Sequence, residues 1–199
     1  MELFDFDKSI RNGRIICGVD EAGRGPLAGD VYAAAVIFDE DTVIEGINDS
    51  KKVSEKKREM LYDVITAKAK AYCIATATIE EIENINILNA AMLAMKRAID
   101  GLDIKPQLAL IDGNKAPEID IPTETVVKGD AKSQSIAAAS ILAKVARDRY
   151  MKQLDEKYPQ YQFSKHNGYP TKVHYEMIEK YGISPVHRPY FLRKFLSKK

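Results

Sequence analysis

One run constrains the fold of this chain more than any other, and it extends from Gly18 to Gly29 with the sequence GVDEAGRGPLAG. The apolar segment 15–19 that leads into it predicts a strand, and neighbouring side chains of a strand point to opposite faces. Asp20 and Glu21 can therefore share one site only where that strand ends. The glycines that follow permit positive φ and a close approach of the backbone to a ligand.

The same run combines groups that suit a metal ion with groups that suit phosphate. Asp20 and Glu21 supply carboxylate oxygens, and Arg24 offers a planar fork of donors that matches phosphate. Together they predict phosphoryl-transfer chemistry. Taken alone, the run is equally compatible with a tight turn that presents a surface acidic pair, so the rest of the chain decides.

Length and composition restrict the class of protein. With 199 residues and 45% hydrophobic content, the chain is long enough for one domain with a sizeable core and a small C-terminal appendage. Two cysteines make no disulfide framework. The N-terminal residues lack the order of a secretory signal, and no apolar run approaches the length of a membrane span. We therefore expect a cytoplasmic protein with no membrane partner.

The pattern of apolar residues predicts an α/β fold. Residues 14–20, 31–38 and 71–78 are typical of strands and suggest an antiparallel meander. The segments 107–112 and 123–128 are short strands, and their alternation with helices indicates parallel, buried pairing. Helices are expected over 54–70 with Ser54 as its cap, over 78–101 behind a capping box, over 135–157 and over 171–181.

Acidic residues stand at the ends of several predicted strands. Asp20 and Glu21 end the first, Asp112 ends the fourth, and Asp130 follows the fifth. Four carboxylates brought together repel unless cations lie among them, and hard oxygen ligands favour Mg²⁺ or Mn²⁺. Two such ions about 3.5 to 4 Å apart form a clamp for in-line attack on a phosphodiester. Taken singly, Asp112 and Asp130 could each be an ordinary turn residue.

Three histidines, His166, His174 and His187, invite comparison with a metal site. Their spacing resembles no zinc pattern. We expect them to hydrogen-bond to the backbone or to contact phosphate instead.

The last twelve residues are basic and contain no acid. Such a tail could follow a nucleic-acid backbone, or it could be a solvated chain end. The basic residues there are Arg188, Arg193, Lys194, Lys198 and Lys199.

Aromatic and basic residues alternate just before that tail. They could form a stacking and backbone-binding surface, or the rings could cover the core beneath a loop. The residues are Lys157, Tyr158, Tyr161, Phe163, Lys165, Tyr169 and Lys172.

Several motifs, in one order, resemble those of bacterial ribonuclease HII, in the type 2 ribonuclease H family. The agreement of separate motifs over nearly the whole chain makes the resemblance specific, whereas any single motif would be a weak match. The motifs are Gly18 to Gly29, Asp49-Ser50-Lys51-Lys52, Asp112-Gly113, Lys128-Gly129-Asp130, residues 137–148, His166 to Thr171, His174, Tyr181-Gly182 and His187-Arg188.

The resemblance implies an RNase H-like fold, a mixed five-stranded sheet flanked by helices with a small helical C-terminal extension. Residues 1–199 would form one catalytic domain, in which 159–199 extend the substrate-binding surface. The implied activity is hydrolysis of the RNA strand of RNA/DNA hybrids and nicking of duplex DNA 5′ of embedded ribonucleotides, during DNA replication and repair. The resemblance also implies products with 3′-hydroxyl and 5′-phosphate ends. The implied metal ligands are Asp20, Glu21, Asp112 and Asp130.

The resemblance also implies a set of substrate contacts. Gly23, Arg24 and Gly25 match the loop that senses the 2′-hydroxyl of the ribonucleotide, a group that is both donor and acceptor. Tyr169 matches the tyrosine that packs on the sugar of the next deoxynucleotide. Lys51 and Lys52 match a basic pair near phosphates. Asn167, where many relatives have lysine, and Pro189-Tyr190 depart from the pattern.

Three other readings stay open at this stage. The chain could be a module that binds hybrids without cutting, although it keeps all four acids. It could be a DNA-only nuclease or resolvase, against which the glycine loop and Tyr169 argue. The related ribonuclease HIII is disfavoured by Arg24 and by the short N-terminus. We expect a monomer whose partner is an RNA/DNA hybrid or a duplex DNA that contains ribonucleotides.

Overall fold

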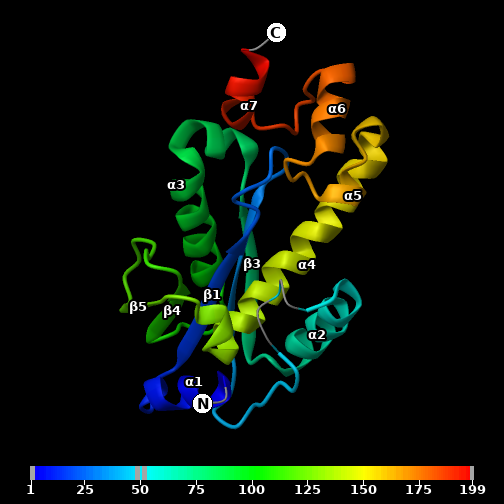
Figure 1. The fold of residues 1–199 in the computed structure, drawn as a ribbon. Helices are drawn as coiled ribbons and strands as arrows, with labels where there is room; N and C mark the ends of the chain where they lie inside the picture. Colours follow the sequence, from blue (N-terminus) through cyan, green and yellow to red (C-terminus); the bar gives the residue numbers. More distant parts are fainter. Residues whose placement is uncertain (1–2, 48–49, 51–52, 198–199) are drawn as a thin grey trace.

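A five-stranded mixed sheet forms the centre of the computed structural model, which describes residues 3–47, 50 and 53–197 (Figure 1). The strand order is β3-β2-β1-β4-β5, with β1 to β3 antiparallel and with β4 and β5 parallel to β1. The α/β class, the mixed sheet and the antiparallel meander are therefore confirmed. The strands are β1 Ile16–Ala22, β2 Val31–Ile37, β3 Ala71–Ala77, β4 Leu108–Asp112 and β5 Thr123–Val126.

The fifth strand differs from its prediction. It pairs in parallel with β4 as expected, but only Val126 of its four residues is buried. Because β5 lies at the edge of the sheet and presents Thr123 to Thr125 to solvent, the expectation of a buried strand was wrong there. A polar, short edge strand resists pairing with other chains.

The four predicted helices are present within one or two residues of their expected bounds. Ser54 accepts a hydrogen bond from the Lys57 N–H, and Thr78 and Glu81 form the capping box. The helices are α1 Leu3–Arg11, α2 Glu55–Lys68, α3 Ile79–Asp100, α4 Gln134–Lys157, α5 Phe163–His166, α6 Lys172–Tyr181 and α7 Pro189–Leu196, with 3₁₀ turns η1 Gly129–Ala131 and η2 Pro159–Tyr161.

Three helices were not predicted, α1, the single turn α5, and α7; of these, α1 and α7 lie at opposite ends of the molecule (Figure 1). Helix α1 packs Phe6 and Ile10 beneath the start of the sheet. Helix α7 begins at Pro189 and buries Leu192 against Leu27. Both are shorter than three full turns, so their stability depends on packing rather than on helix propensity.

Alternating side chains of β2 separate two layers of core. Ala33 and Ala35 face α3, whereas Ala34 and Val36 face α4. Figure 1 accordingly shows the green helix α3 and the yellow helix α4 on opposite sides of the sheet. Small residues on both faces of β2 let the two long helices approach the sheet closely.

Helix α4 comes closest to the sheet at Gly18 of β1. A side chain there would overlap the backbone of Ser135 and Ile136. The start of α4 is also held by the buried Asp7 of α1, which accepts hydrogen bonds from the Ser135 N–H at 2.8 Å and from its hydroxyl at 2.7 Å. These contacts determine which side chains of α4 lie next to the end of β1.

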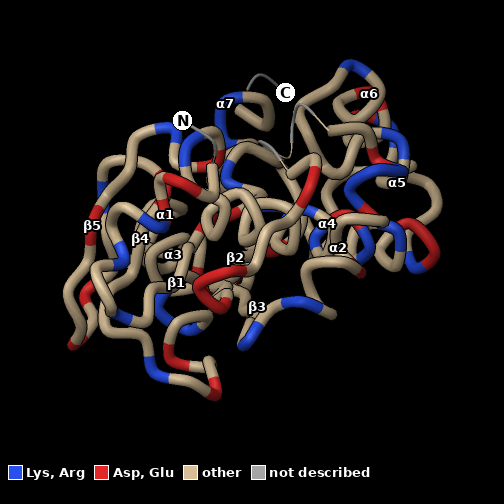
Figure 2. The backbone as a smooth tube through the Cα atoms, turned by 90° about the horizontal axis from the view of Figure 1, so that it is seen from below, with Lys and Arg blue, Asp and Glu red and all other residues tan. Residues whose placement is uncertain are grey.

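The charged residues are distributed over the whole surface. Lys and Arg are interspersed with Asp and Glu along the chain (Figure 2), consistent with the formal net charge of +1. Within the described part of the chain, none of the helices combines the length and the apolar character that crossing a membrane requires.

Candidate active site

A hollow of about 200 Å³ lies where β1 leaves the sheet. It brings together the acidic end of β1, the glycine loop, one face of α4 and Tyr169. Its lining residues are Asp20, Glu21, Ala22, Gly23, Arg24, Gly25, Ser50, Ser140, Lys144 and Tyr169.

Asp20 lies at the bottom of this hollow. It is buried, its carboxylate accepts the Glu21 N–H at 2.7 Å, and the side chain of Ser140 donates to it. Burial raises the pKa of Asp20 well above its usual range, and the carboxylates of Glu21 and Asp112 raise it further. A carboxyl group whose pKa is strongly raised by burial and by neighbouring carboxylates, and which lines a hollow, is typical of an active site.

Glu21 borders the same hollow although it neighbours Asp20 on a strand. The pairing of β1 with β4 ends at Val19, so β1 continues past its neighbour with one edge open. The strand thus runs two residues beyond the expected Asp20, to Ala22, and the two acids meet at this open edge. Arg24 lies 3.1 Å from Glu21 and forms an ion pair with it.

Asp112 and Asp130 approach from the neighbouring strand and turn. Asp112 ends β4, and its Oδ1 accepts the Gly129 N–H at 2.7 Å. Asp130 lies in η1 and is buried. Asp112 is thus an electrostatic neighbour of Asp20 on one side and contacts the turn that holds Asp130 on the other.

These carboxylates have the donor chemistry for a hard divalent cation. The carboxylate oxygens, with Asp20 buried beside Glu21 and Asp112, fit Mg²⁺ or Mn²⁺. Among the described residues, no three acidic, histidine or cysteine side chains are arranged to hold a metal ion as they stand. Glu21 contacts Arg24 through Oε1, and Asp112 accepts the Gly129 N–H through Oδ1, so each carboxylate keeps a second oxygen for a cation.

Tyr169 lies beside the glycine loop, as its predicted role requires. Its side chain is 39% exposed, and its ring is close to Gly25. The Lys144 ammonium lies 6.0 Å from the ring centroid, and the Arg147 guanidinium lies 5.9 Å from it. An exposed ring beside a glycine loop can receive a flat or apolar face of a ligand.

Four residues of the hollow were named in sequence motifs but not predicted as site residues: Ala22, Ser50, Ser140 and Lys144. Ser140 and Lys144 come from α4, and Ser140 also contacts the Ser50 hydroxyl at 2.9 Å. The signal was the spacing of Ser140, Lys144 and Arg147, which places all three on one face of a helix. The predicted phosphate ligands Lys51 and Lys52 lie outside the described residues.

The three histidines form one buried cluster, and their partners identify the proton on each ring. His187 accepts the Ser184 N–H at Nδ1, so its Nε2 donates to His174 Nε2 over 3.1 Å. His174 in turn donates from Nδ1 to the Tyr169 carbonyl at 2.9 Å. His166 donates from Nε2 to the Tyr161 carbonyl. All three rings are neutral and bonded to the backbone or to one another, which agrees with backbone bonding rather than a zinc site.

The basic tail contains one residue whose predicted role was wrong. Arg188 is fully buried, so it cannot follow a nucleic-acid backbone. Arg193 and Lys194 are on the exposed side of α7, where Arg193 lies 3.7 Å from the Tyr190 ring centroid. Lys198 and Lys199 lie outside the described residues.

The aromatic run before the tail divides in two. Tyr161 and Phe163 are buried with their rings stacked, which supports the core interpretation for them. Tyr169 is the exposed member beside the hollow.

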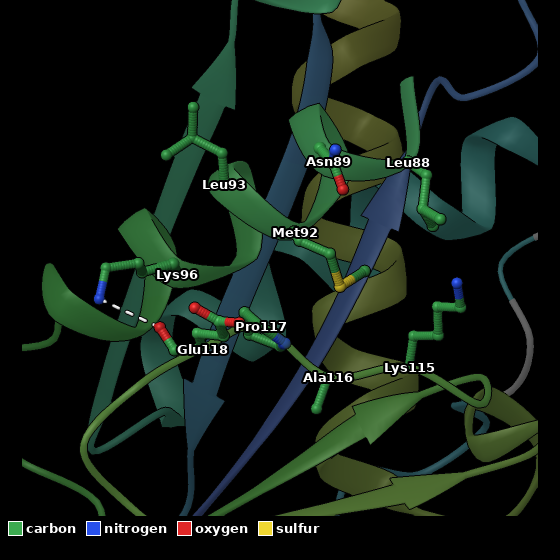
Figure 3. Close-up of a pocket in the computed structure, with 9 residues that line it drawn as sticks. All are labelled: Leu88, Asn89, Met92, Leu93, Lys96, Lys115, Ala116, Pro117 and Glu118. Carbon is green, nitrogen blue, oxygen red and sulfur yellow. Dashed lines mark hydrogen bonds between the residues drawn. The ribbon is translucent and has the colours of Figure 1, made fainter. Parts of the chain in front are cut away.

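A larger groove of about 580 Å³ lies away from the carboxylates, between α3 and the loop after β4 (Figure 3). Met92 and Leu93 contribute apolar surface to it, and Lys96 donates to the Glu118 carbonyl at 3.2 Å. The groove is open and lacks paired acids, so the chemistry belongs to the smaller hollow.

Fold and site together define the class of protein. A mixed sheet of this order, with acids gathered where β1 and β4 end, is an RNase H-like α/β fold. A similar solved structure is the ribonuclease H2 from Pyrococcus horikoshii OT3. It matches with a TM-score of 0.77 and 28% identity over 92% of this chain and 97% of that one.

Sequence comparisons identify the family. The Ribonuclease HII family matches residues 17–194. The Ribonuclease HII of Dechloromonas aromatica (strain RCB) is 57% identical over 89% of this chain and 90% of its own. That of Caldicellulosiruptor bescii is 51% identical over 98% of this chain and 95% of its own. The chain belongs to the ribonuclease HII family, endoribonucleases that cleave RNA in RNA/DNA hybrids.

The histidine cluster predicts a loss of stability in acid. Burial lowers the pKa of His174 and of His187 to about 4, from about 6.5 in the unfolded chain. The folded state therefore favours the neutral rings. Their contribution to the free energy of unfolding is fully present above about pH 6.5 and is lost as the pH falls towards 4. The free energy of unfolding should decrease by up to about 1.4 kcal/mol per pH unit for each ring.

Urea unfolding at a series of pH values measures this slope. His187→Asn should reduce the slope between pH 6.5 and 4, because the other titrating groups are common to both proteins. Equal slopes in the two proteins would contradict the assignment of neutral rings.

Proposed function

We propose that this protein nicks duplex DNA on the 5′ side of an embedded ribonucleotide as well as cutting the RNA strand of hybrids. The observation that supports this most is that Gly23, Arg24, Gly25 and Tyr169 all line the hollow that holds Asp20, with the Tyr169 ring next to Gly25. A ribose hydroxyl can meet backbone groups of Gly23 to Gly25, while the ring of Tyr169 packs on the next sugar. Recognition of a hydroxyl on one sugar and of its absence on the next sugar would identify a DNA–RNA junction.

The four carboxylates are proposed to hold divalent cations. Asp20, Glu21, Asp112 and Asp130 would be the ligands, and the cation would be Mg²⁺ or Mn²⁺. A pair of such ions would supply activation of the attacking water and stabilisation of the leaving oxygen, and the expected products would carry 3′-hydroxyl and 5′-phosphate ends. Arg24 pairs with Glu21, and its half-exposed guanidinium would donate to a phosphate of the bound duplex.

Substrate binding is proposed to extend beyond the hollow. Residues 159–199 would form a substrate-binding extension of a single catalytic domain, with Arg193 and Lys194 of α7 near the duplex backbone. Lys51 and Lys52 would contact phosphates close to the cut. We further propose that the protein works as a cytoplasmic monomer in the removal of ribonucleotides during DNA replication and repair.

Replacement of one carboxylate tests the catalytic assignment. Asp130→Asn removes a ligand charge without removing bulk, so turnover should fall about 100-fold or more while the fold and duplex binding are retained. The assay compares an all-DNA duplex, a duplex with one ribonucleotide and a full hybrid, each with Mg²⁺, with Mn²⁺ and with chelator.

Asp63→Asn, an exposed acid on α2, is the matched control and should cut at the wild-type rate. Full activity in chelator, or a wild-type rate for Asp130→Asn, would contradict the metal-site proposal. Tight binding of hybrids with no cleavage by the wild-type protein would support the binding-module alternative, and cleavage of all-DNA duplex would support the DNA-only nuclease.

Replacement of the ring tests junction sensing. Tyr169→Ala should lower the rate on a single embedded ribonucleotide about tenfold, because a packed ring contributes roughly 1–3 kcal/mol. Tyr169→Phe should be mild, since packing needs the ring and not its hydroxyl. Tyr72→Ala, which removes an equally exposed ring from β3, should leave the rate unchanged. If Tyr169→Ala kept the wild-type rate on both the junction and the hybrid, Tyr169 would have no sensing role.

A further inference from the structure

Two arginines are fully buried beneath the glycine loop, which here comprises residues 23–29: Arg147 of α4 and Arg188 just before α7, each 0% exposed. A guanidinium taken out of water is costly unless its donors are satisfied. Burial, together with the charge of Arg147, lowers the pKa of Arg188 to about 9, so it stays charged at neutral pH. The charge of Asp30 partly offsets the two cations.

The acceptors for Arg188 are carbonyl groups of a single loop. Its guanidinium donates to the carbonyls of Gly23 at 2.8 Å, Pro26 at 2.9 Å and Gly29 at 2.8 Å, with Arg24 more distant at 3.3 Å. Five donors in one plane can be shared among such carbonyls, whereas the three donors of a lysine ammonium radiate from a point. The loop is thus wrapped around one planar cation.

The direction of these carbonyls determines the direction of the neighbouring amides. In a trans peptide the N–H points opposite to the carbonyl of the preceding residue. With the Gly23 and Arg24 carbonyls turned inward to Arg188, the N–H groups of Arg24 and Gly25 point outward. Within the described residues, neither N–H has a hydrogen-bond partner in the chain, so both are free for a ligand that offers an acceptor oxygen.

Arg147 joins this loop to the segment that presents Tyr169. It donates to the Ala28 carbonyl at 3.1 Å and to the Asn167 carbonyl at 3.0 Å. Its side chain fills the space that a Gly23 side chain would need. Three main-chain hydrogen bonds of 2.8 Å also connect the glycine loop to the C-terminal part of the chain. The Leu27 N–H donates to the Gly168 carbonyl, the Gly29 N–H to the Val186 carbonyl and the Arg188 N–H to the Leu27 carbonyl.

We propose that Arg188 is a positioning residue that holds the glycine loop with its amides facing the substrate, while Arg147 sets the spacing between that loop and Tyr169. The ligand of the outward amides is an oxygen of the sugar or phosphate at the ribonucleotide. This inference rests on the proposed function, because the amides act on that substrate. Arg188 touches no substrate itself, and its effect passes through the loop.

The test compares Arg188→Lys and Arg188→Ala with Arg14→Lys. Arg14 is the matched control, because its guanidinium also donates to backbone carbonyls, those of Ile10 and Arg11, but outside the site. Steady-state cleavage of a duplex with one ribonucleotide is measured for each variant that circular dichroism shows to be folded. In Arg188→Lys we expect kcat to fall at least tenfold and KM to change less than threefold, because the contacts that bind the duplex backbone remain. Arg14→Lys should match the wild type.

A second measurement is independent of cleavage. Hydrogen exchange of the Leu27 and Gly29 amides should accelerate at least tenfold in Arg188→Lys, while the amides of β2 and those of Arg14→Lys keep wild-type rates. A folded Arg188→Lys with wild-type kcat and wild-type exchange would overturn the inference, as would a change confined to KM. If the wild-type protein failed to cut the ribonucleotide, the proposed function would fall, and the exchange rates would still decide whether Arg188 holds the loop.

Discussion

The close approach of α4 to β1 is the contact on which the site depends. Gly18 permits it, because any side chain at that position would overlap the backbone at the start of the helix. From this contact the helix runs along the sheet and places Ser140 against Asp20 and Lys144 over the hollow. One turn further, Arg147 lies beneath the glycine loop. The single interface between α4 and β1 therefore positions residues both at the carboxylates and at the glycine loop.

The site is built from groups that are unfavourable to bury. Asp20 is enclosed beside two other carboxylates, two guanidinium groups lie under the loop, and three neutral histidines support the segment that bears Tyr169. The guanidinium and imidazole groups are tolerated because backbone groups, or in the imidazoles also a neighbouring ring, satisfy their hydrogen bonds. Proteins retain such strained or costly groups chiefly where function requires them. The carboxylates differ from these groups because they lie close to one another and repel. The ion pair of Glu21 with Arg24 and the hydrogen bond from the Gly129 N–H to Asp112 relieve only part of this repulsion.

Much of the fold and the centre of the site followed from local sequence patterns. Strands and long helices have strong periodicity, and Asp20 and Asp112 could be placed because acids at strand ends gather at one edge of a sheet. The helix α1 was missed although Leu3, Phe6 and Ile10 recur at helical spacing, because so short a segment becomes a stable helix only by packing on the sheet, which a local pattern does not contain. The edge position of β5 depends on the order of strands, which a local pattern does not contain.

The buried arginines show most clearly what local sequence patterns cannot predict. Arg188 was counted with a basic tail, because nothing near it in sequence indicates that its partners lie about 160 residues earlier in the chain. The hydrogen bond between His174 and His187 could not be predicted either, because only the tertiary fold brings the two rings together. Long-range partners of single polar residues are fixed by topology.

The fold holds Asp20 in a buried site beside other carboxylates, and we propose that a divalent cation would relieve the resulting cost in stability. This proposal is tested most directly by the Tm of the wild type and of Asp20→Asn, each measured in chelator and in Mg²⁺ or Mn²⁺. In chelator, Asp20→Asn should be the more stable protein, by roughly 2–4 °C for each kcal/mol of repulsion and desolvation removed. The cation should raise the Tm of the wild type and have little effect on the variant. A variant less stable than the wild type in chelator, or an equal response of both proteins to the cation, would contradict the account.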